Sequence, residues 1–201
     1  MPDPSPSSPQ RPLILGSTSP YRRELLGRLR LAFDAIAPNV DETPRPGERP
    51  ADLAARLAQA KALDVARRHP EAIVIGSDQV ADLDGTPLGK PGSHDRAVAQ
   101  LTRMSGRTVV FQTAVCVACL ATGFQQTELA AVEVRFRPLS REEIEAYLQA
   151  EQPYDCAGSA KSEGLGISLL ERIGNDDPTA LIGLPLIRTC GLLRAAGLRL
   201  Y

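Results

Sequence analysis

The chain has 201 residues, of which 43% are hydrophobic and 4% aromatic, and its formal net charge is −1. This length predicts one domain or two small lobes, while the apolar fraction excludes a wholly disordered chain and the balanced charge excludes a polybasic nucleic-acid binder. Because no apolar run approaches the ~18 residues of a membrane span and the N-terminus lacks the apolar core of a signal peptide, we expect a cytoplasmic protein without membrane partners.

The first elements are marked by proline, serine and small residues. Residues 1–11 are rich in proline and serine, which predicts a disordered extension ahead of a single domain over 12–201. The apolar run 12–17 predicts a strand. Ser19 is a good N-cap and Pro20 suits the first helical turn, so we expect a helix directly after it.

Strand and helix signals alternate along the rest of the chain. Apolar runs, several rich in β-branched residues, predict strands over 33–37, 72–78, 107–121, 127–139 and 167–173. Apolar residues at helical spacing and one capping box predict helices over 51–68, 93–104, from Ser140 onwards, and over 184–197. Asp84-Gly85 is a hairpin turn signal, and 175–183 is expected to be a short helical turn. Two of the strands form a long antiparallel hairpin around 121–123, so we expect an α/β fold with a mixed sheet.

Two residue counts narrow the chemistry. The chain has only two histidines, which argues strongly against a serine–histidine–aspartate triad and against a multi-histidine metal site. It has 20 arginines but only three lysines, which are Lys61, Lys90 and Lys161. In a chain so rich in arginine, each lysine is a candidate for a place where a compact ammonium is needed, although chance explains each one equally well at this point.

The candidate chemistry lies in polar segments that adjoin apolar elements. These segments are 17–23, 41–42, 77–79 together with Lys90, and 159–163. The first places hydroxyl groups and the adjacent Arg22 and Arg23 at a helix N-terminus, where free N–H groups, the helix dipole and guanidinium groups all suit a phosphate chain. The alternative is an ordinary solvated helix with a serine N-cap. The sequence contains no Walker loop.

Carboxylates complete this set. Asp78 is expected directly after a buried strand, where its position would be rigid, and Glu42 lies in a proline-rich loop. Carboxylates can hold a divalent cation, the cation and basic groups can neutralise a polyphosphate, and one carboxylate can orient or deprotonate a water. That scheme needs no histidine. The alternative is that Asp78 is one of the many acidic residues found at strand ends.

Eight ordered motifs point to one family. The segments GSTSPYRRELL, VDET, RLAQAKA, VIGSDQV, LGKP, MSGRTV, CAGSAKSEGLG and IGLPL resemble the motifs of the Maf (septum-formation) family of nucleoside triphosphate pyrophosphatases. The resemblance extends over about residues 12–198. Each motif alone is weak, but eight in the same order are specific.

The resemblance implies a fold and a reaction. It implies an α/β fold related to the inosine-triphosphate pyrophosphatases, with two lobes around a deep cleft, often as a homodimer. The reaction would convert a nucleoside triphosphate to its monophosphate and pyrophosphate with Mg²⁺ or Mn²⁺. By residue match, Asp78 would be the proton acceptor, Glu42 and Asp78 would be the metal-binding acids, and the phosphate-binding residues would be Ser17, Arg22, Arg23, Lys61 and Lys90.

Three positions bear on the base. Family members active on dTTP and UTP usually read SPRR, SDT and a glutamine where this chain has Tyr21, Gln79 and Glu163, a combination that resembles the subgroup active on 7-methyl-GTP. An aromatic face attracts the cationic methylated guanine, and a carboxylate can accept both the N1–H and the exocyclic amine of guanine. Three alternatives stay open: ordinary packing for Tyr21, a broader or dTTP- and UTP-type pyrophosphatase, and a nucleotide-binding regulator of septum formation.

Overall fold

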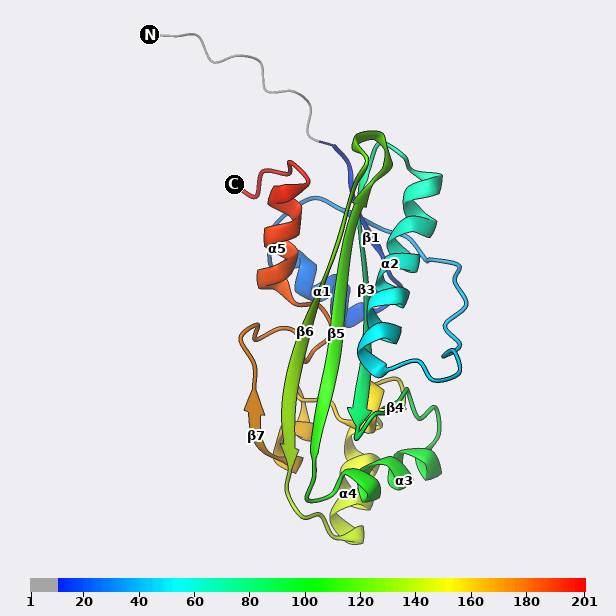
Figure 1. The fold of residues 1–201 in the computed structure, drawn as a ribbon. Coiled ribbons are helices and arrows are strands. Elements are labelled where there is room, and N and C mark those ends of the chain that lie inside the picture. Colours follow the sequence, from blue (N-terminus) through cyan, green and yellow to red (C-terminus); the bar gives the residue numbers. More distant parts are fainter. Residues whose placement is uncertain (1–10) are drawn as a thin grey trace.

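A computed structural model describes residues 11–201 (Figure 1). The predicted extension over 1–11 therefore lies outside the described residues, except for Arg11, whose guanidinium pairs with Glu71 at 2.6 Å. The strands are β1 (Leu13–Gly16), β2 (Asp34–Ala35), β3 (Ile73–Leu83), β4 (Thr86–Leu88), β5 (Thr108–Cys119), β6 (Phe124–Phe136) and β7 (Leu170–Gly174). The α-helices are α1 (Pro20–Gly27), α2 (Pro50–Arg68), α3 (His94–Met104), α4 (Arg141–Glu151) and α5 (Leu186–Ala195). Short 3₁₀ helices are η1 (Leu120–Thr122), η2 (Ala157–Ser159) and η3 (Leu165–Leu169).

The seven strands form one mixed sheet, as predicted. Their order is β2-β1-β3-β5-β6-β7, with β4 added beside β3. The pairs β1–β2 and β1–β3 are parallel, and the remaining pairs are antiparallel. The strands β5 and β6 form the expected long hairpin, paired from Thr108 with Arg135 to Cys119 with Phe124. The α/β fold with a mixed sheet is confirmed.

Helices cover both faces of this sheet (Figure 1). One hydrophobic cluster packs α2 against one face. The other face carries α1 and α5 near the chain termini and α3 and α4 at the opposite end, each pair over its own cluster. This gives the two lobes that the family resemblance implies. Among the described residues, no helix is both long enough and apolar enough to cross a membrane.

Several local predictions hold because short-range chemistry decides them. Ser19 caps α1 with its side chain, and Ser140 with Glu143 forms the capping box of α4. Asp84 and Gly85 connect β3 to β4 with φ values of 51° and 80°, the left-handed conformations that a two-residue hairpin loop of type I′ requires.

Several boundary predictions were wrong, including the strand expected over 127–139, which is observed over Phe124–Phe136. The strand expected over 72–78 continues to Leu83, because β3 stays paired with β5 through Asp78 and beyond. The strand expected over 167–173 begins only at Leu170, since η3 occupies the residues before it. The short helical turn expected over 175–183 is present as a run of turns at 178–183, with hydrogen bonds between residues three apart such as the one from the Gly183 N–H to the Ala180 carbonyl.

A gap opens along one edge of β3. On this edge β1 pairs with residues 73–76 and β4 pairs with residues 81–83. The opposite edge is paired with β5 throughout 74–82. Residues 77–80 thus have no strand neighbour on the first edge among the described residues. They lie between the part of β3 that pairs in parallel with β1 and the part that pairs antiparallel with β4. The candidate site lies at this gap.

Candidate active site

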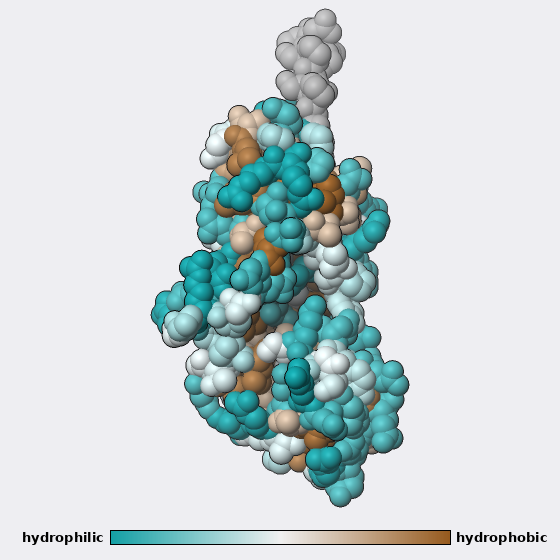
Figure 2. Space-filling model, turned by 90° about the vertical axis from the view of Figure 1, so that its right-hand side faces the viewer, coloured by the Kyte–Doolittle hydropathy of each residue, from teal (hydrophilic) through white to brown (hydrophobic). Residues whose placement is uncertain are grey.

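A cavity of about 540 Å³ lies at the gap, within the size range of small-molecule sites. Its walls come from the start of α1, the loop before α2 and one side of α2 itself, and the middle of β3. The residues after β4, the region around η2 and the turn before α5 complete them. The molecular surface is largely hydrophilic on the face in Figure 2 and is hollowed about midway along the molecule. The cavity lies between the lobes, as the resemblance implies.

The cavity brings together nine of the ten residues that the sequence singles out. They are Ser17, Tyr21, Arg22, Glu42, Lys61, Asp78, Gln79, Lys90 and Glu163. The tenth, Arg23, is exposed and does not line the cavity, because consecutive helical residues point in directions about 100° apart. The motif spacing alone could not separate the two adjacent arginines.

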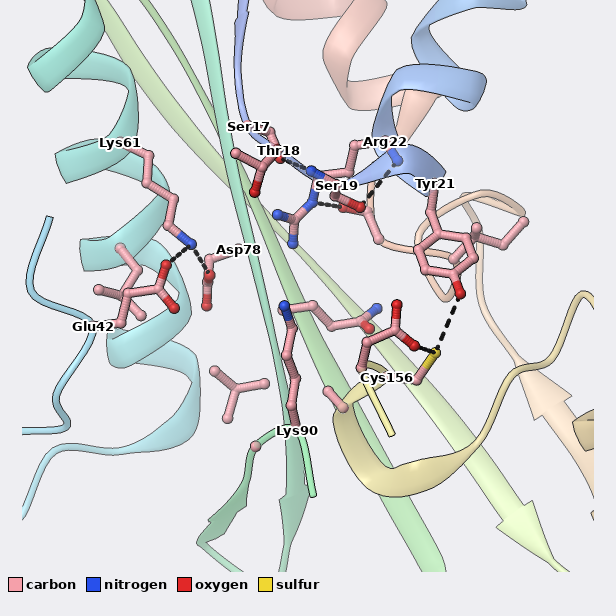
Figure 3. A pocket seen from close by; sticks show the side chains of 18 of the residues that line it. Ser17, Thr18, Ser19, Tyr21, Arg22, Glu42, Lys61, Asp78, Lys90 and Cys156 are labelled. Carbon is pink, nitrogen blue, oxygen red and sulfur yellow. Dashed lines mark hydrogen bonds and ion pairs between the residues drawn. The ribbon is translucent and has the colours of Figure 1, made fainter. Parts of the chain in front are cut away.

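The start of α1 forms the first wall. Ser17 is buried and its hydroxyl accepts a hydrogen bond from the Ser19 N–H at 3.1 Å. The Ser19 hydroxyl caps the helix by accepting from the Arg22 N–H at 3.4 Å. The Arg22 Nε donates to the Gly183 carbonyl at 2.8 Å, which fixes the guanidinium beside the cavity (Figure 3). A helix N-terminus and a held guanidinium on one wall suit an anionic ligand.

Lys61 joins the two carboxylates on the opposite wall (Figure 3). Its Nζ lies 2.6 Å from Asp78 Oδ1 and 2.7 Å from Glu42 Oε1. The Lys61 and Asp78 side chains are only 7% and 10% exposed, whereas that of Glu42 is 60% exposed. The second oxygen of Asp78 accepts no hydrogen bond from the described residues and stays available in the cavity.

Close packing of α2 on β3 makes this contact possible. A Cβ on Gly76 would lie 2.3 Å from the Ala58 carbonyl oxygen and 2.5 Å from the Ala62 nitrogen, so only glycine allows the helix to lie so near the strand. Lys61 on α2 and Asp78 on β3 then meet two residues further along the strand. The sequence predicted both residues but gave no signal for their contact.

The charged side chains around the cavity shift one another's pKa values. Burial raises the pKa of Glu42, but the hydrogen bond and charge of Lys61, with help from Lys90 and Arg22, outweigh burial and leave that pKa below its ordinary value. Burial lowers the pKa of Arg22, and the negative charges of Asp78 and Glu42 oppose that effect. Lys90 is exposed at the cavity and forms no hydrogen bond or ion pair with residues 11–201. Its ammonium is therefore available to a ligand.

The donor set bears on the divalent metal that the family implies. No group of three or more histidine, cysteine, aspartate or glutamate side chains that could hold a metal occurs among the described residues. The cavity does present two carboxylates, Glu42 and Asp78, on either side of one ammonium. Mg²⁺ is commonly bound by one or two carboxylates together with substrate phosphates and water. The residues present fit a metal that arrives with, or is completed by, a phosphate ligand.

An aromatic side chain stands at the other end of the cavity. The Cys156 thiol donates to the Tyr21 hydroxyl across 3.9 Å (Figure 3). Lys161 Nζ lies 5.9 Å from the centre of the Tyr21 ring. Lys161 itself pairs with Glu151 at 2.9 Å and does not line the cavity. Burial raises the pKa of Tyr21, and burial together with Asp155 raises that of Cys156 to about 12. Both groups are therefore protonated at neutral pH, and Cys156 is no thiolate nucleophile.

Several cavity residues to which sequence reasoning gave no role lie in two segments. They include Asp155, Cys156, Leu181, Ile182 and Gly183. Cys156, Ile182 and Gly183 lie inside two of the recognised motifs, and Asp155 and Leu181 lie directly before them. Except for Asp155 these residues are uncharged, and nothing in the sequence indicates that the turn at 181–183 lines the cavity.

Comparison with known proteins identifies the family. Residues 12–196 match the sequence model of the family described as Maf-like protein. The chain belongs to the Maf family. The family resemblance drawn from the eight motifs is thereby confirmed.

Similar Maf proteins carry one name. The chain is 71% identical to a protein of Polaromonas sp. (strain JS666) named "7-methyl-GTP pyrophosphatase", over 95% of this chain and 87% of that protein. It is 67% identical to a protein of the same name from Albidiferax ferrireducens, over 94% of this chain and 96% of that protein. A Methylobacillus flagellatus protein with this name is 58% identical, over 92% and 97% of the two chains.

Proposed function

We propose that this chain hydrolyses 7-methyl-GTP to 7-methyl-GMP and pyrophosphate, and so removes a modified nucleotide. The name shared by relatives at 58–71% identity supports this activity. The observation that carries the proposal is the pairing of Lys61 with Glu42 and Asp78 on one wall of a nucleotide-sized cavity, facing Arg22 and the start of α1.

The arrangement of these residues supports the following reaction. A water attacks the α-phosphorus, and the bond from that phosphorus to the bridging oxygen of pyrophosphate breaks. Asp78 orients the water and accepts its proton on the oxygen that Lys61 leaves free. Arg22, Lys90 and the N–H groups at the start of α1 bind the phosphate oxygens. Lys61 holds Asp78 and Glu42 in place.

A divalent cation, Mg²⁺ or Mn²⁺, belongs to this proposal. Glu42 and Asp78 would hold it, and it would supply positive charge against the triphosphate. Arg23, which the resemblance also assigns to phosphate binding, does not line the cavity, and its role stays a prediction. The single domain over 12–201, the cytoplasmic location, the homodimer and the lack of nucleic-acid or membrane partners stay predictions.

The site of bond cleavage tests the reaction. In ¹⁸O-labelled water with Mg²⁺ or Mn²⁺, the label is expected in 7-methyl-GMP, because water bonds to the α-phosphorus. Mass spectrometry of the products measures it. Label confined to orthophosphate would mean attack at the γ-phosphorus and would rule out this reaction. A panel including dTTP and UTP separates the broader pyrophosphatase, and binding without any product would favour a nucleotide-binding regulator.

Base selection is expected to depend on Tyr21. Its ring face attracts the positive charge of the methylated guanine, by roughly 0.5–2 kcal/mol. Tyr21→Ala should reduce the ratio of kcat/KM for 7-methyl-GTP to that for GTP by about two- to thirtyfold. Tyr21→Phe keeps the ring and serves as the matched control, with the ratio retained. An unchanged ratio in Tyr21→Ala would remove the ring from base selection.

Glu163 is expected to select guanine over pyrimidines. It lines the cavity but is exposed in the free protein, so its carboxylate loses water only when a base covers it. Hydrogen bonds to a charged acceptor contribute about 1.5 kcal/mol or more. Glu163→Gln should therefore lower kcat/KM for 7-methyl-GTP and GTP alike by about tenfold. Steady-state kinetics with UTP as the reference substrate measures this, and an equal loss for UTP would contradict it.

A further inference from the structure

The side-chain amide of Gln79 is surrounded by hydrogen-bond acceptors on its nitrogen side. Gln79 Nε2 lies 2.9 Å from Thr113 Oγ1, 3.0 Å from the Ala180 carbonyl oxygen and 2.9 Å from the Leu181 carbonyl oxygen. The two carbonyls can only accept. Thr113 sits directly opposite Gln79 on β5.

Thr113 can also only accept from Gln79. Its side chain is fully buried, and its hydroxyl donates to the Ala180 carbonyl at 3.0 Å. A hydroxyl has one proton, so the proton spent on Ala180 leaves only lone pairs toward Gln79. All three neighbours therefore require the NH₂ group of Gln79, and turning the amide over would place its oxygen against three acceptors.

This arrangement leaves one atom of the amide for the cavity. Gln79 lines the cavity, and its Oε1 accepts no hydrogen bond from residues 11–201. An oxygen fixed in this way accepts hydrogen bonds and cannot donate them. It repels phosphate oxygens and base carbonyl oxygens, which are also acceptors, and it attracts an N–H or O–H donor of the substrate.

We propose that Thr113 is a positioning residue for base selection: with the carbonyls of Ala180 and Leu181 it fixes the Gln79 amide so that Oε1 receives an N–H donor from the guanine edge. This inference rests on the proposed function and names the group that orients one of its specificity residues. Guanine presents N1–H and an exocyclic amine, whereas uracil presents one N–H between two carbonyl oxygens. Thr113 itself touches no substrate.

Thr113→Val tests this fixed orientation of the Gln79 amide, which we call the amide lock, because valine has nearly the same shape as threonine. Valine can neither donate to Ala180 nor accept from Gln79, so the Gln79 amide loses one of its three acceptors and is held only by the Ala180 and Leu181 carbonyls. The remaining hold on the orientation of the amide is therefore weaker. We expect kcat/KM for 7-methyl-GTP to fall about five- to tenfold, mainly through KM, with less than twofold change for UTP. Thr113→Ser keeps the hydroxyl and should restore the ratio. Equal losses for both nucleotides, or no loss for either, would overturn the proposal.

A double-mutant cycle separates positioning from a general packing effect. In a Gln79→Met background no amide is left to orient, so adding Thr113→Val should cause no further change in the ratio of 7-methyl-GTP to UTP kcat/KM. Additive effects of the two substitutions would show that Thr113 acts by another route. Thermal unfolding of each variant identifies losses that come from instability alone.

A substrate-free measurement keeps this inference distinct from the proposed function. In ¹H–¹⁵N spectra, the Gln79 side-chain amide protons, assigned by their loss in Gln79→Met, should exchange slowly in the wild type and at least tenfold faster in Thr113→Val. Fast exchange in the wild type would disprove the lock. A wild type that prefers UTP while showing slow exchange would instead refute 7-methyl-GTP as substrate and leave the lock in place.

A ribose hydroxyl, rather than the base, could donate the hydrogen bond to Gln79 Oε1, and kinetics with deoxy analogues distinguish the two donors. A 2′-deoxy or 3′-deoxy analogue of the guanine nucleotide would then lose the same five- to tenfold in the wild type and nothing further in Thr113→Val. We expect both analogues to keep their sensitivity to Thr113→Val, and the opposite result would reject the base as the source of the donor.

Discussion

Asp78→Asn is expected to fold and to lose about 10²–10⁴-fold in kcat, the usual cost of removing a general base. Asparagine keeps the shape of the side chain but cannot accept the proton of the attacking water. The position of Asp78 is fixed by pairing with Ala114 in the sheet and by the 2.6 Å contact with Lys61. Lys61 retains Glu42 as a partner in the variant, which limits the loss of stability.

The matched control is Asp82→Asn. Asp82 belongs to the same strand but does not line the cavity, and its carboxylate accepts from the Gly85 N–H at 2.7 Å, a role that an asparagine oxygen can fill. Turnover of 7-methyl-GTP and thermal unfolding are measured for both variants. A folded Asp78→Asn protein with near-native turnover would remove both the base and the metal role of this carboxylate.

Lys61→Met is expected to cost both activity and stability. It removes the ammonium between two carboxylates, one of them only 10% exposed. Leaving a buried charge without its partner typically costs about 3–5 kcal/mol, and we expect the lower end because Glu42 stays accessible to water. Chemical denaturation measures the free energy of unfolding. The loss of Asp78 and Glu42 geometry should also reduce turnover at least as far as Asp78→Asn does.

The pH dependence of this loss gives a second test. In the wild type, Lys61 keeps the pKa of Glu42 below its ordinary value, so Glu42 stabilises the fold above that ordinary value and ceases to do so as pH falls through the lowered pKa. Without Lys61, only Lys90 and Arg22 oppose the effect of burial on the pKa of Glu42, so the stabilisation that its charge provides is smaller. The stability difference between the two proteins should therefore be largest near neutral pH and narrow under acid conditions. A constant difference would contradict this account.

Replacing Lys61 or Lys90 by arginine tests whether each site needs a compact ammonium. Lys61 is 7% exposed in its side chain, so the larger guanidinium of Lys61→Arg has no room between the carboxylates. Lys90 is exposed, so Lys90→Arg meets less steric resistance, although a guanidinium still binds phosphate differently from an ammonium. We expect both to lower kcat/KM, with Lys61→Arg the more damaging. Two silent replacements would mean that the rarity of lysine carries no functional meaning.

Sequence reasoning succeeded where neighbouring residues decide the structure. Ser19 and Ser140 predict the starts of α1 and α4, because their capping contacts lie within one helical turn. It failed for Asp78, which was expected after the end of a strand. Polar residues there suggested an end, whereas pairing with β5, more than thirty residues away in sequence, carries β3 onward.

In the candidate site, too, residue types could be predicted from local motifs, whereas contacts between distant segments could not. Residue types at motif positions predicted nine cavity residues, but not which of the two adjacent arginines faces inward. Thr113 gave no signal at all, since a threonine in a strand is common and its role depends on carbonyls of the turn at 180–181. Roles that depend on backbone atoms brought together by the fold leave no pattern in the sequence.

The lobes share their strands, and this limits how the cavity can close. Ile73 and Ile75 of β3 belong to the cluster near the termini, while Ala81 and Leu83 of the same strand belong to the cluster at the other end. The strand β5 is divided in the same way. A rigid-body hinge between the lobes would have to bend adjacent hydrogen-bonded strands in their middle. We therefore expect adjustment to a bound nucleotide in the loop that carries Glu42 and in the segments around Lys90 and η2, which rim the cavity.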